Sequence, residues 1–147
     1  MRASSFVALL LACEADPAGS VLVDRVIDGD TVELESGELV RYLMVDAPEL
    51  DACFGAEAAE ANRRLVEGEH VTLRFDRERV DDYDRVLAWV EVDGRALNLS
   101  LVERGLACVL HIPPNGDDAV EAFDLAEARA RHEARRLWGA CEVPPCG

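Results

Sequence analysis

The sequence predicts an α+β domain built on a small Greek-key β-barrel of about five strands, with about three helices. Short stretches of alternating apolar and polar residues are separated by glycine-containing turns, as in antiparallel sheets. An alanine-rich helical stretch interrupts the strands, and a second helical pattern lies near the C-terminus. Among barrels of this size, the five-stranded OB type is the best match.

Three strands joined by tight turns are expected to begin the barrel. Asp28-Gly29-Asp30 and Ser36-Gly37-Glu38 supply the turns, because glycine permits sharp changes of chain direction. Pro48 ends the third strand, since proline lacks the N–H that a sheet requires. These strands are expected at residues 21–27, 31–35 and 39–45.

The remaining elements are expected to alternate between helix and strand. Gly68 suits the end of the first helix, and Asn98 suits the N-cap of the second. Asp118 and Glu121 form a capping-box-like start for the third. We expect helices at 56–68, 99–104 and 118–137, and strands at 71–75, 86–92 and 107–112.

The N-terminus has the order of features found in an export leader. One arginine precedes an apolar run that ends at Ala12-Cys13, which resembles a bacterial lipoprotein box with Cys13 as the lipidated residue. A plain secretory peptide and a wrongly assigned start codon remain open. We therefore expect an exported protein, either a cell envelope lipoprotein or a secreted protein, that meets the membrane only through a lipid at Cys13. The expected divisions are a signal peptide at 1–12, a tether at 13–19, the domain at 20–140 and a tail at 141–147.

The chain is strongly acidic, with a formal net charge of -15 and no lysine. Proteins that bind nucleic acid tightly without catalysis usually have a basic face, so the charge argues against that class. It leaves open an enzyme that needs only local arginines and a bridging cation. It also leaves open a plain solvated surface that keeps molecules apart.

Four cysteines remain after Cys13, and an even number in an exported chain suggests disulfides. Four cysteines allow three pairings. We favour Cys53 with Cys141, because both flank loops that place the C-terminal tail near the acidic residues. Cys108 lies in an apolar stretch, and we expect it to be a buried free thiol. No spacing resembles a zinc site.

Acidic residues recur at the ends of the first strands. Asp28, Asp30, Asp46 and Glu49 lie within 25 residues, with Arg41 between two apolar runs. Carboxylates and an arginine at neighbouring strand ends suit a hard cation beside a phosphate. Alternatively, the aspartates are ordinary turn residues and the arginine is a barrel-end residue that reaches water.

Four patterns in order, IDGDTV (27–32), VRYLMVDAPE (40–49), DYDRVLAWV (82–90) and LVERGLA (101–107), resemble the staphylococcal nuclease family. FGAEA (54–58) lies between the second and third. The resemblance covers roughly residues 20–140 and implies the family's OB-like barrel.

The resemblance implies a calcium site. Asp30 and Asp46 match the two carboxylates that hold Ca2+, and Asp28 matches an acid that supports the water shell of the ion. Ala47 stands where the family has a threonine whose backbone carbonyl is a metal ligand. Alanine keeps that carbonyl and loses the hydroxyl.

The resemblance also implies catalytic residues. Glu49 matches the general base, Arg41 and Arg85 match the arginines that grip the scissile phosphate, and Tyr83 matches a phosphate-contacting tyrosine. The implied function is a calcium-dependent endonuclease that hydrolyses the phosphodiester bonds of DNA and RNA. The 5′-oxygen leaves and 3′-phosphate ends remain. We expect a monomer. In an alternative arrangement, Glu49 and Arg85 pair only with each other.

Two departures concern the substrate. Asp84 stands where the family pattern has glycine, and residues 110–115 lack the family's base-stacking tyrosines. One rival class is a catalytically degenerate nuclease-like module of the cell envelope that binds nucleic acid or protein. Another is an envelope protein that calcium stabilises and that has no nucleic-acid role.

Overall fold

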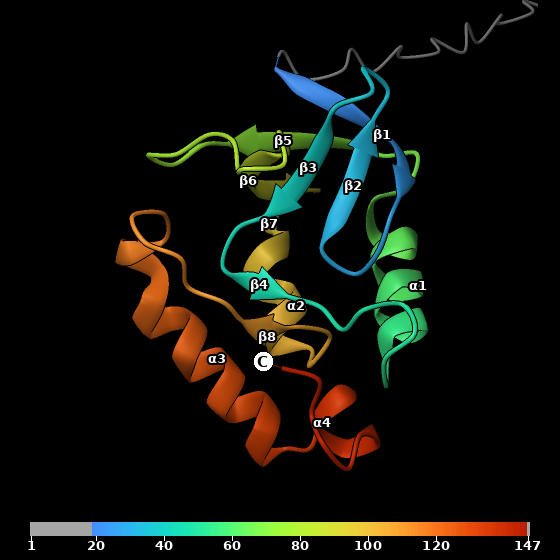
Figure 1. The fold of residues 1–147 in the computed structure, drawn as a ribbon, viewed down its shortest axis with the longest axis vertical. Helices are drawn as coiled ribbons and strands as arrows, with labels where there is room; N and C mark the ends of the chain where they lie inside the picture. Colours follow the sequence, from blue (N-terminus) through green and yellow to red (C-terminus); the bar gives the residue numbers. More distant parts are fainter. Residues whose placement is uncertain (1–18, 147) are drawn as a thin grey trace, which may run out of the picture.

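The computed structural model describes residues 19–146, which form a β-barrel with helices at its side and below it (Figure 1). The expected leader at 1–12, the lipidation site Cys13 and most of the tether lie outside the described residues. The strands are β1 Ser20–Val26, β2 Thr31–Leu34, β3 Leu39–Tyr42, β4 Val45–Asp46, β5 His70–Arg74, β6 Val86–Val92, β7 Arg95–Ala96 and β8 Cys108–Val109. The helices are α1 Gly55–Val66, α2 Leu97–Glu103, the 3-10 turn η1 Asp117–Ala119, α3 Val120–His132 and α4 Leu137–Ala140.

The strands close into the expected barrel. The main sheet has the order β3-β2-β1-β5-β6-β7, and a further pairing between β3 and β6 closes the barrel, with the short β7 attached to β6. That closing pair is parallel, whereas the other pairs are antiparallel. The predicted OB-like α+β barrel is therefore confirmed.

The barrel interior is filled by the alternate apolar residues of the strands. Val32 and Leu34 on β2, and Val40 and Tyr42 on β3, are each at most 4% exposed. Residues two apart point to the same face of a strand, so these positions fill one core. Helix α2 lies below the barrel in Figure 1, and its Leu101 is completely buried in the same core.

The third predicted strand, 39–45, is broken in the structure. β3 ends at Tyr42, and Met44 has a φ of 68°, a left-handed conformation that strands do not adopt. After this turn the chain continues as β4, which pairs with β8 through Val45 and Val109. The break turns Asp46 out of the barrel sheet and toward the loops.

Asn98 is not the N-cap of α2, as the sequence suggested. It lies inside the helix and is 2% exposed, and Ala96 occupies the N-cap position. Its side chain donates hydrogen bonds to the carbonyls of Leu43 (2.9 Å) and Ala88 (3.1 Å) and accepts one from the Val90 N–H (2.8 Å). The Ala88 carbonyl also accepts the Leu43 N–H at 3.0 Å, so Asn98 chiefly provides partners for the Leu43 carbonyl and the Val90 N–H, which explains a buried polar residue here.

The single helix expected at 118–137 is also wrong. Asp118 lies in η1 and makes no capping hydrogen bond, and α3 ends at His132. Ala134 and Arg136 then adopt positive φ angles of 48° and 44°, which a helix does not allow. The expected strand at 107–112 shortens to β8. Within residues 19–146, no helix has the length and apolar character needed to cross a bilayer.

Two disulfides fix the C-terminal tail. Cys53 is joined to Cys141 with a Cα–Cα distance of 6.0 Å, and Cys108 is joined to Cys146 with a distance of 5.9 Å. The expectation of a free thiol at Cys108 is therefore wrong. The tail beyond α4 folds back onto the cluster of Cys108, Leu137 and Cys141, which brings Cys146 within reach.

Candidate active site

The loop between β1 and β2 is shaped by close packing. The Asp28 carboxylate accepts the N–H of Asp30 at 3.0 Å, which tightens the turn. Any side chain at Gly29 would collide with Ala47, at 2.5 Å from its Cβ, and would crowd Ala58 at 3.1 Å. Glycine is required here for space, because the loop lies directly against α1 and the segment after β4.

A buried amide on α1 holds this loop in place. Asn62 is completely buried, donates to the carbonyl of Asp28 (2.9 Å) and accepts the hydroxyl hydrogen of Tyr42 (3.1 Å). Burial raises the pKa of Tyr42, so its hydroxyl stays protonated as a donor. The sequence analysis missed Asn62. The sequence does contain an indication of its role: Asn62 is a polar residue on the same face of α1 as the buried Ala58 and Val66.

Asp30 is a nearly buried carboxylate with several donors around it. It is 5% exposed and accepts the Thr31 hydroxyl at 2.9 Å and the Ala47 N–H at 2.7 Å. Desolvation raises the pKa of Asp30 to about 7; Arg41 opposes this shift and Asp28 adds to it. The carboxylate is therefore poorly compensated by its protein neighbours alone.

Arg41 is held inside the site by four oxygen groups. Its Nη1 donates to the carbonyls of Tyr42 and Val45, both at 2.7 Å. Its Nε lies 3.3 Å from Asp30 Oδ1, and its Nη2 lies 3.5 Å from Asp46 Oδ1. The side chain is 12% exposed, so it does not simply reach out to water. The break after β3 supplies the carbonyl of Val45 and places Asp46 beside this arginine.

The donor set suits a hard cation. Asp30 and Asp46 both approach one guanidinium, and the raised pKa of Asp30, caused chiefly by burial, indicates a poorly solvated carboxylate that a cation would stabilise. Calcium prefers such oxygen ligands. No cluster of three or more histidine, cysteine or acidic side chains placed for a metal occurs in residues 19–146. A bound ion would be held by the Asp30 and Asp46 carboxylates, which both approach Arg41.

A second turn positions Arg85. The Asp81 carboxylate accepts the backbone N–H groups of Tyr83 (2.9 Å) and Arg85 (3.0 Å) and the Arg85 Nε–H (2.8 Å). Burial opposes the change, but these hydrogen bonds hold the pKa of Asp81 below its ordinary value. Asp81 is not among the site residues predicted from the sequence. An aspartate whose carboxylate accepts the N–H groups two and four residues further along the chain is the usual feature of such a turn.

Asp84 lies in the same turn with a φ of 61°. This left-handed conformation is one that glycine adopts freely and that aspartate adopts at some cost. The left-handed conformation therefore explains why the family pattern has glycine at this position. Asp84 retains the turn and adds a negative charge next to Arg85.

Arg41, Tyr83 and Arg85 line one cleft of about 340 Å³. The parallel pairing of β3 with β6 brings the two arginine-bearing segments side by side. Tyr83 is 80% exposed, and the Arg85 guanidinium lies 5.4 Å from the centre of its ring. Four apolar side chains also line the cleft, Met44, Leu87, Leu110 and Ile112, and so do three acidic ones, Glu78, Asp81 and Asp82. Two guanidiniums and a tyrosine on one cleft are suited to a phosphate group.

Glu49 lies apart from this cleft lining. Its side chain is exposed and forms no hydrogen bond or ion pair with any residue between 19 and 146. Its backbone carbonyl accepts the Ala52 N–H at 2.9 Å and lies tightly against Gly55. The alternative of a Glu49–Arg85 pair is wrong, because Arg85 pairs with Asp81.

The barrel, the acidic loops and the two arginines define a nuclease-type domain, and the comparisons with known proteins agree. The sequence model of the family described as "Staphylococcal nuclease homologue" matches residues 39–140. The chain belongs to this family. Arg41, Asp46, Glu49 and Arg85 lie within the matched residues, whereas Asp28 and Asp30 precede them.

Three relatives illustrate the similarity. The chain is 35% identical to "Endonuclease YncB" of Bacillus subtilis (strain 168) over 129 residues, which cover 81% of this chain and 61% of that protein. It is 34% identical to "SPbeta prophage-derived endonuclease YokF" of the same organism, covering 80% of this chain and 43% of the relative. It is 32% identical to "Thermonuclease" of Staphylococcus intermedius, covering 81% and 76%. The match thus spans less than two thirds of the two Bacillus proteins.

Proposed function

We propose that this protein is a calcium-dependent endonuclease that hydrolyses phosphodiester bonds of DNA and RNA. The observation that supports it most is the cleft shared by Arg41, Tyr83 and Arg85, beside the carboxylates of Asp30 and Asp46. The names of the relatives, endonuclease and thermonuclease, support the same class of reaction.

The arginines serve the phosphate. Each guanidinium has several donors in one plane, so Arg41 and Arg85 together match the oxygens of a phosphodiester and offset the charge that grows during attack. Arg41 is already oriented by the carbonyls of Tyr42 and Val45. Little reorganisation is therefore needed on its side of the cleft.

Glu49 is the proposed general base. Its carboxylate has no partner among the described residues and is free to accept a proton from water. When bound, Ca2+ would supply positive charge that stabilises the developing charge on phosphate oxygen. Release of the 5′-oxygen, which leaves 3′-phosphate ends, is part of the proposal.

Asp81 sets a condition on substrate binding. Its carboxylate holds the Nε–H of Arg85, so a phosphate must either replace it or use the other donors of that guanidinium. This contact also favours a rival function. A protein whose Arg85 stays bound to Asp81 is a catalytically degenerate module of the cell envelope that binds nucleic acid or protein without cleavage.

Export to an oxidising compartment is part of the proposal. Cys53–Cys141 and Cys108–Cys146 are disulfides, and such bonds persist outside the cytoplasm. We propose a secreted or lipid-anchored protein, with Cys13 as the anchor, that acts as a monomer.

The test is cleavage of end-labelled single-stranded DNA with calcium and again with an excess of chelator. We expect cleavage only with calcium, and products that carry 3′-phosphates. Glu49→Gln should remove most of the rate while leaving the melting temperature unchanged, because the side chain has no described partner. Cleavage that persists in chelator refutes calcium dependence, and calcium-independent binding without cleavage supports the rival module.

A further inference from the structure

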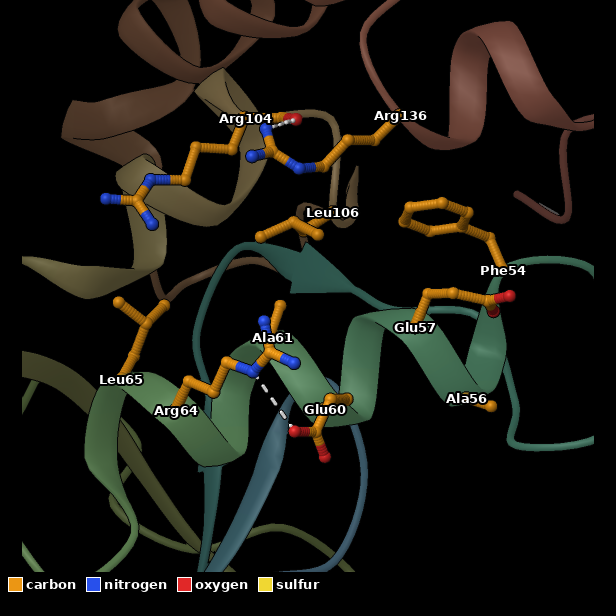
Figure 2. A pocket seen from close by; sticks show the side chains of 10 residues that line it. All are labelled: Phe54, Ala56, Glu57, Glu60, Ala61, Arg64, Leu65, Arg104, Leu106 and Arg136. Carbon is orange, nitrogen blue, oxygen red and sulfur yellow. Dashed lines mark hydrogen bonds and ion pairs between the residues drawn. The ribbon is translucent and has the colours of Figure 1, made fainter.

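A second pocket lies between α1 and the C-terminal part of the chain, apart from the candidate active site (Figure 2). Its volume is about 560 Å³, and it shares no lining residue with the cleft of Arg41 and Arg85. The residues that matter here are Phe54, Arg64, Leu65, Arg104, Leu106 and Arg136.

Three arginines reach this pocket from two walls. Figure 2 shows Arg104 and Arg136 on one wall and Arg64, from α1, on the other. Arg136 uses Nη1 to donate to the carbonyl of Arg104 at 2.9 Å, and Arg64 pairs with Glu60 at 3.1 Å. The guanidinium of Arg104 has no partner among residues 19–146. In a chain of net charge -15, this gathering of cationic groups calls for an anionic ligand.

Two of the residues that line the pocket have a strained backbone conformation that their surroundings maintain. Phe54 has a φ of 67° and Arg136 a φ of 44°, both in the region that disfavours residues with side chains. Such strain persists only where the surroundings impose it. The Leu137 N–H donates to the Gly105 carbonyl at 3.1 Å, and the disulfide of Cys53 lies next to Phe54. These contacts fix one strained residue on each side of the pocket.

The surface between the arginines is apolar. Leu65 and Leu106 lie between the walls, and the ring of Phe54 stands at one end (Figure 2). Cationic groups beside an apolar surface that ends in an aromatic ring suit single-stranded nucleic acid, whose phosphates alternate with flat bases. A free inorganic anion would use the arginines and gain nothing from the apolar surface.

Acidic groups limit the affinity without cancelling the site. Glu60 binds both Arg63 and Arg64, so its charge is largely used within α1. Glu57 lies beside Phe54 at the end of the pocket, away from Arg104. The positive end is therefore formed by Arg104 and Arg136.

The pocket is connected to the active site by one short loop. Glu49 lies at its start and Phe54 at its end, and the loop is tightened by the hydrogen bond from Ala52 N–H to the Glu49 carbonyl. We propose that the pocket is a second substrate subsite, which binds phosphates and a base of the single strand that extends from the cleavage site. This inference rests on the proposed nuclease function.

Binding without turnover tests it. The affinity of a fluorescent 12-nucleotide single strand is measured in chelator for the unchanged protein, Arg104→Ala and Arg104→Gln. Arg129→Ala is the matched control, because Arg129 is an exposed arginine on α3 that lines neither pocket. Both Arg104 variants should bind about tenfold more weakly, as for one lost charged hydrogen bond. The slope of log affinity against log salt should fall by about 0.7, as for one lost phosphate contact.

Three results would overturn the subsite. The first is equal affinity of the Arg104 variants and the unchanged protein for the strand. The second is an equal loss of affinity in Arg129→Ala. The third is displacement of the labelled strand by inorganic phosphate at a concentration equal to that of the phosphates in the strand. The assay needs no cleavage, so a protein that binds through Arg104 but never cleaves with calcium would refute the nuclease function while keeping the strand-binding pocket.

Discussion

Replacing Asn62 with alanine should destabilise the domain and loosen the acidic loop. The change removes the acceptor of the Tyr42 hydroxyl at 3.1 Å and the donor to the Asp28 carbonyl at 2.9 Å. A polar group left buried without a partner costs about 1–3 kcal/mol. Two such groups predict a loss of about 2–6 kcal/mol in the free energy of unfolding, a large share of the 5–15 kcal/mol typical of a domain.

Equilibrium unfolding in urea measures this loss, and a double-mutant cycle isolates its cause. Tyr42→Phe removes the hydroxyl, so the combined variant should lose about 1 kcal/mol less than the sum of the single variants. Asn98→Ala is the matched control, because it removes another buried amide whose contacts lie on the barrel side of α2. Calcium should raise the melting temperature of the control and have little effect on Asn62→Ala. A loss below about 1 kcal/mol, or strict additivity, would refute the reasoning.

Three further changes test other parts of the structure. Asp84→Gly should raise the free energy of unfolding by about 0.5–1 kcal/mol, because glycine adopts the φ of 61° without strain; an unchanged or lower urea midpoint contradicts this. Cys141→Ser removes the disulfide to Cys53, which links residues 88 positions apart, and should lower the free energy of unfolding by about 4 kcal/mol in the same assay. An unchanged free energy of unfolding would mean that the disulfide does not constrain the unfolded chain. Hydrogen bonding, chiefly from the Gly116 N–H, lowers the pKa of Asp76 in the folded protein. The ionised carboxylate therefore stabilises the fold at pH values above its ordinary pKa of 3.8, and this contribution is lost as the pH falls through the lower pKa of the folded state. The melting temperature of Asp76→Ala should therefore lie below that of the unchanged protein at pH 7, with a difference that shrinks below pH 3.8; a constant difference would exclude the linkage.

Local patterns were sufficient for the barrel. Alternating burial on β2 and β3, with glycines between them, is a property of neighbouring residues, so it is visible in the sequence. The break at Met44 is not, because the left-handed turn is stabilised by contacts far along the chain, such as the hydrogen bond from Asn98 to Leu43. The early end of α3 has a similar origin, since the Leu137 N–H finds its acceptor on Gly105.

The site shows the same division. Asp30 and Arg41 were identified because they lie at strand ends in a recognisable motif, and the structure places them 3.3 Å apart. Asp81 was missed although its partners lie two and four residues further along, because its turn was not recognised in the sequence. Asn62 was missed because its partners, Tyr42 and Asp28, come close only in the folded chain. The tail residue Cys146 likewise reaches its partner only after the chain has folded back.

The central claim is that Arg85 and its cleft act on a phosphodiester, and one rate measures this most directly. Arg85 is the better choice for substitution, because Arg41 also holds two backbone carbonyls and its loss would disturb the fold. With saturating calcium, Arg85→Ala should cleave single-stranded DNA about 10²–10³-fold more slowly in a single turnover, while Arg129→Ala keeps the full rate. Equal rates for Arg85→Ala and the unchanged protein would contradict the proposed active site.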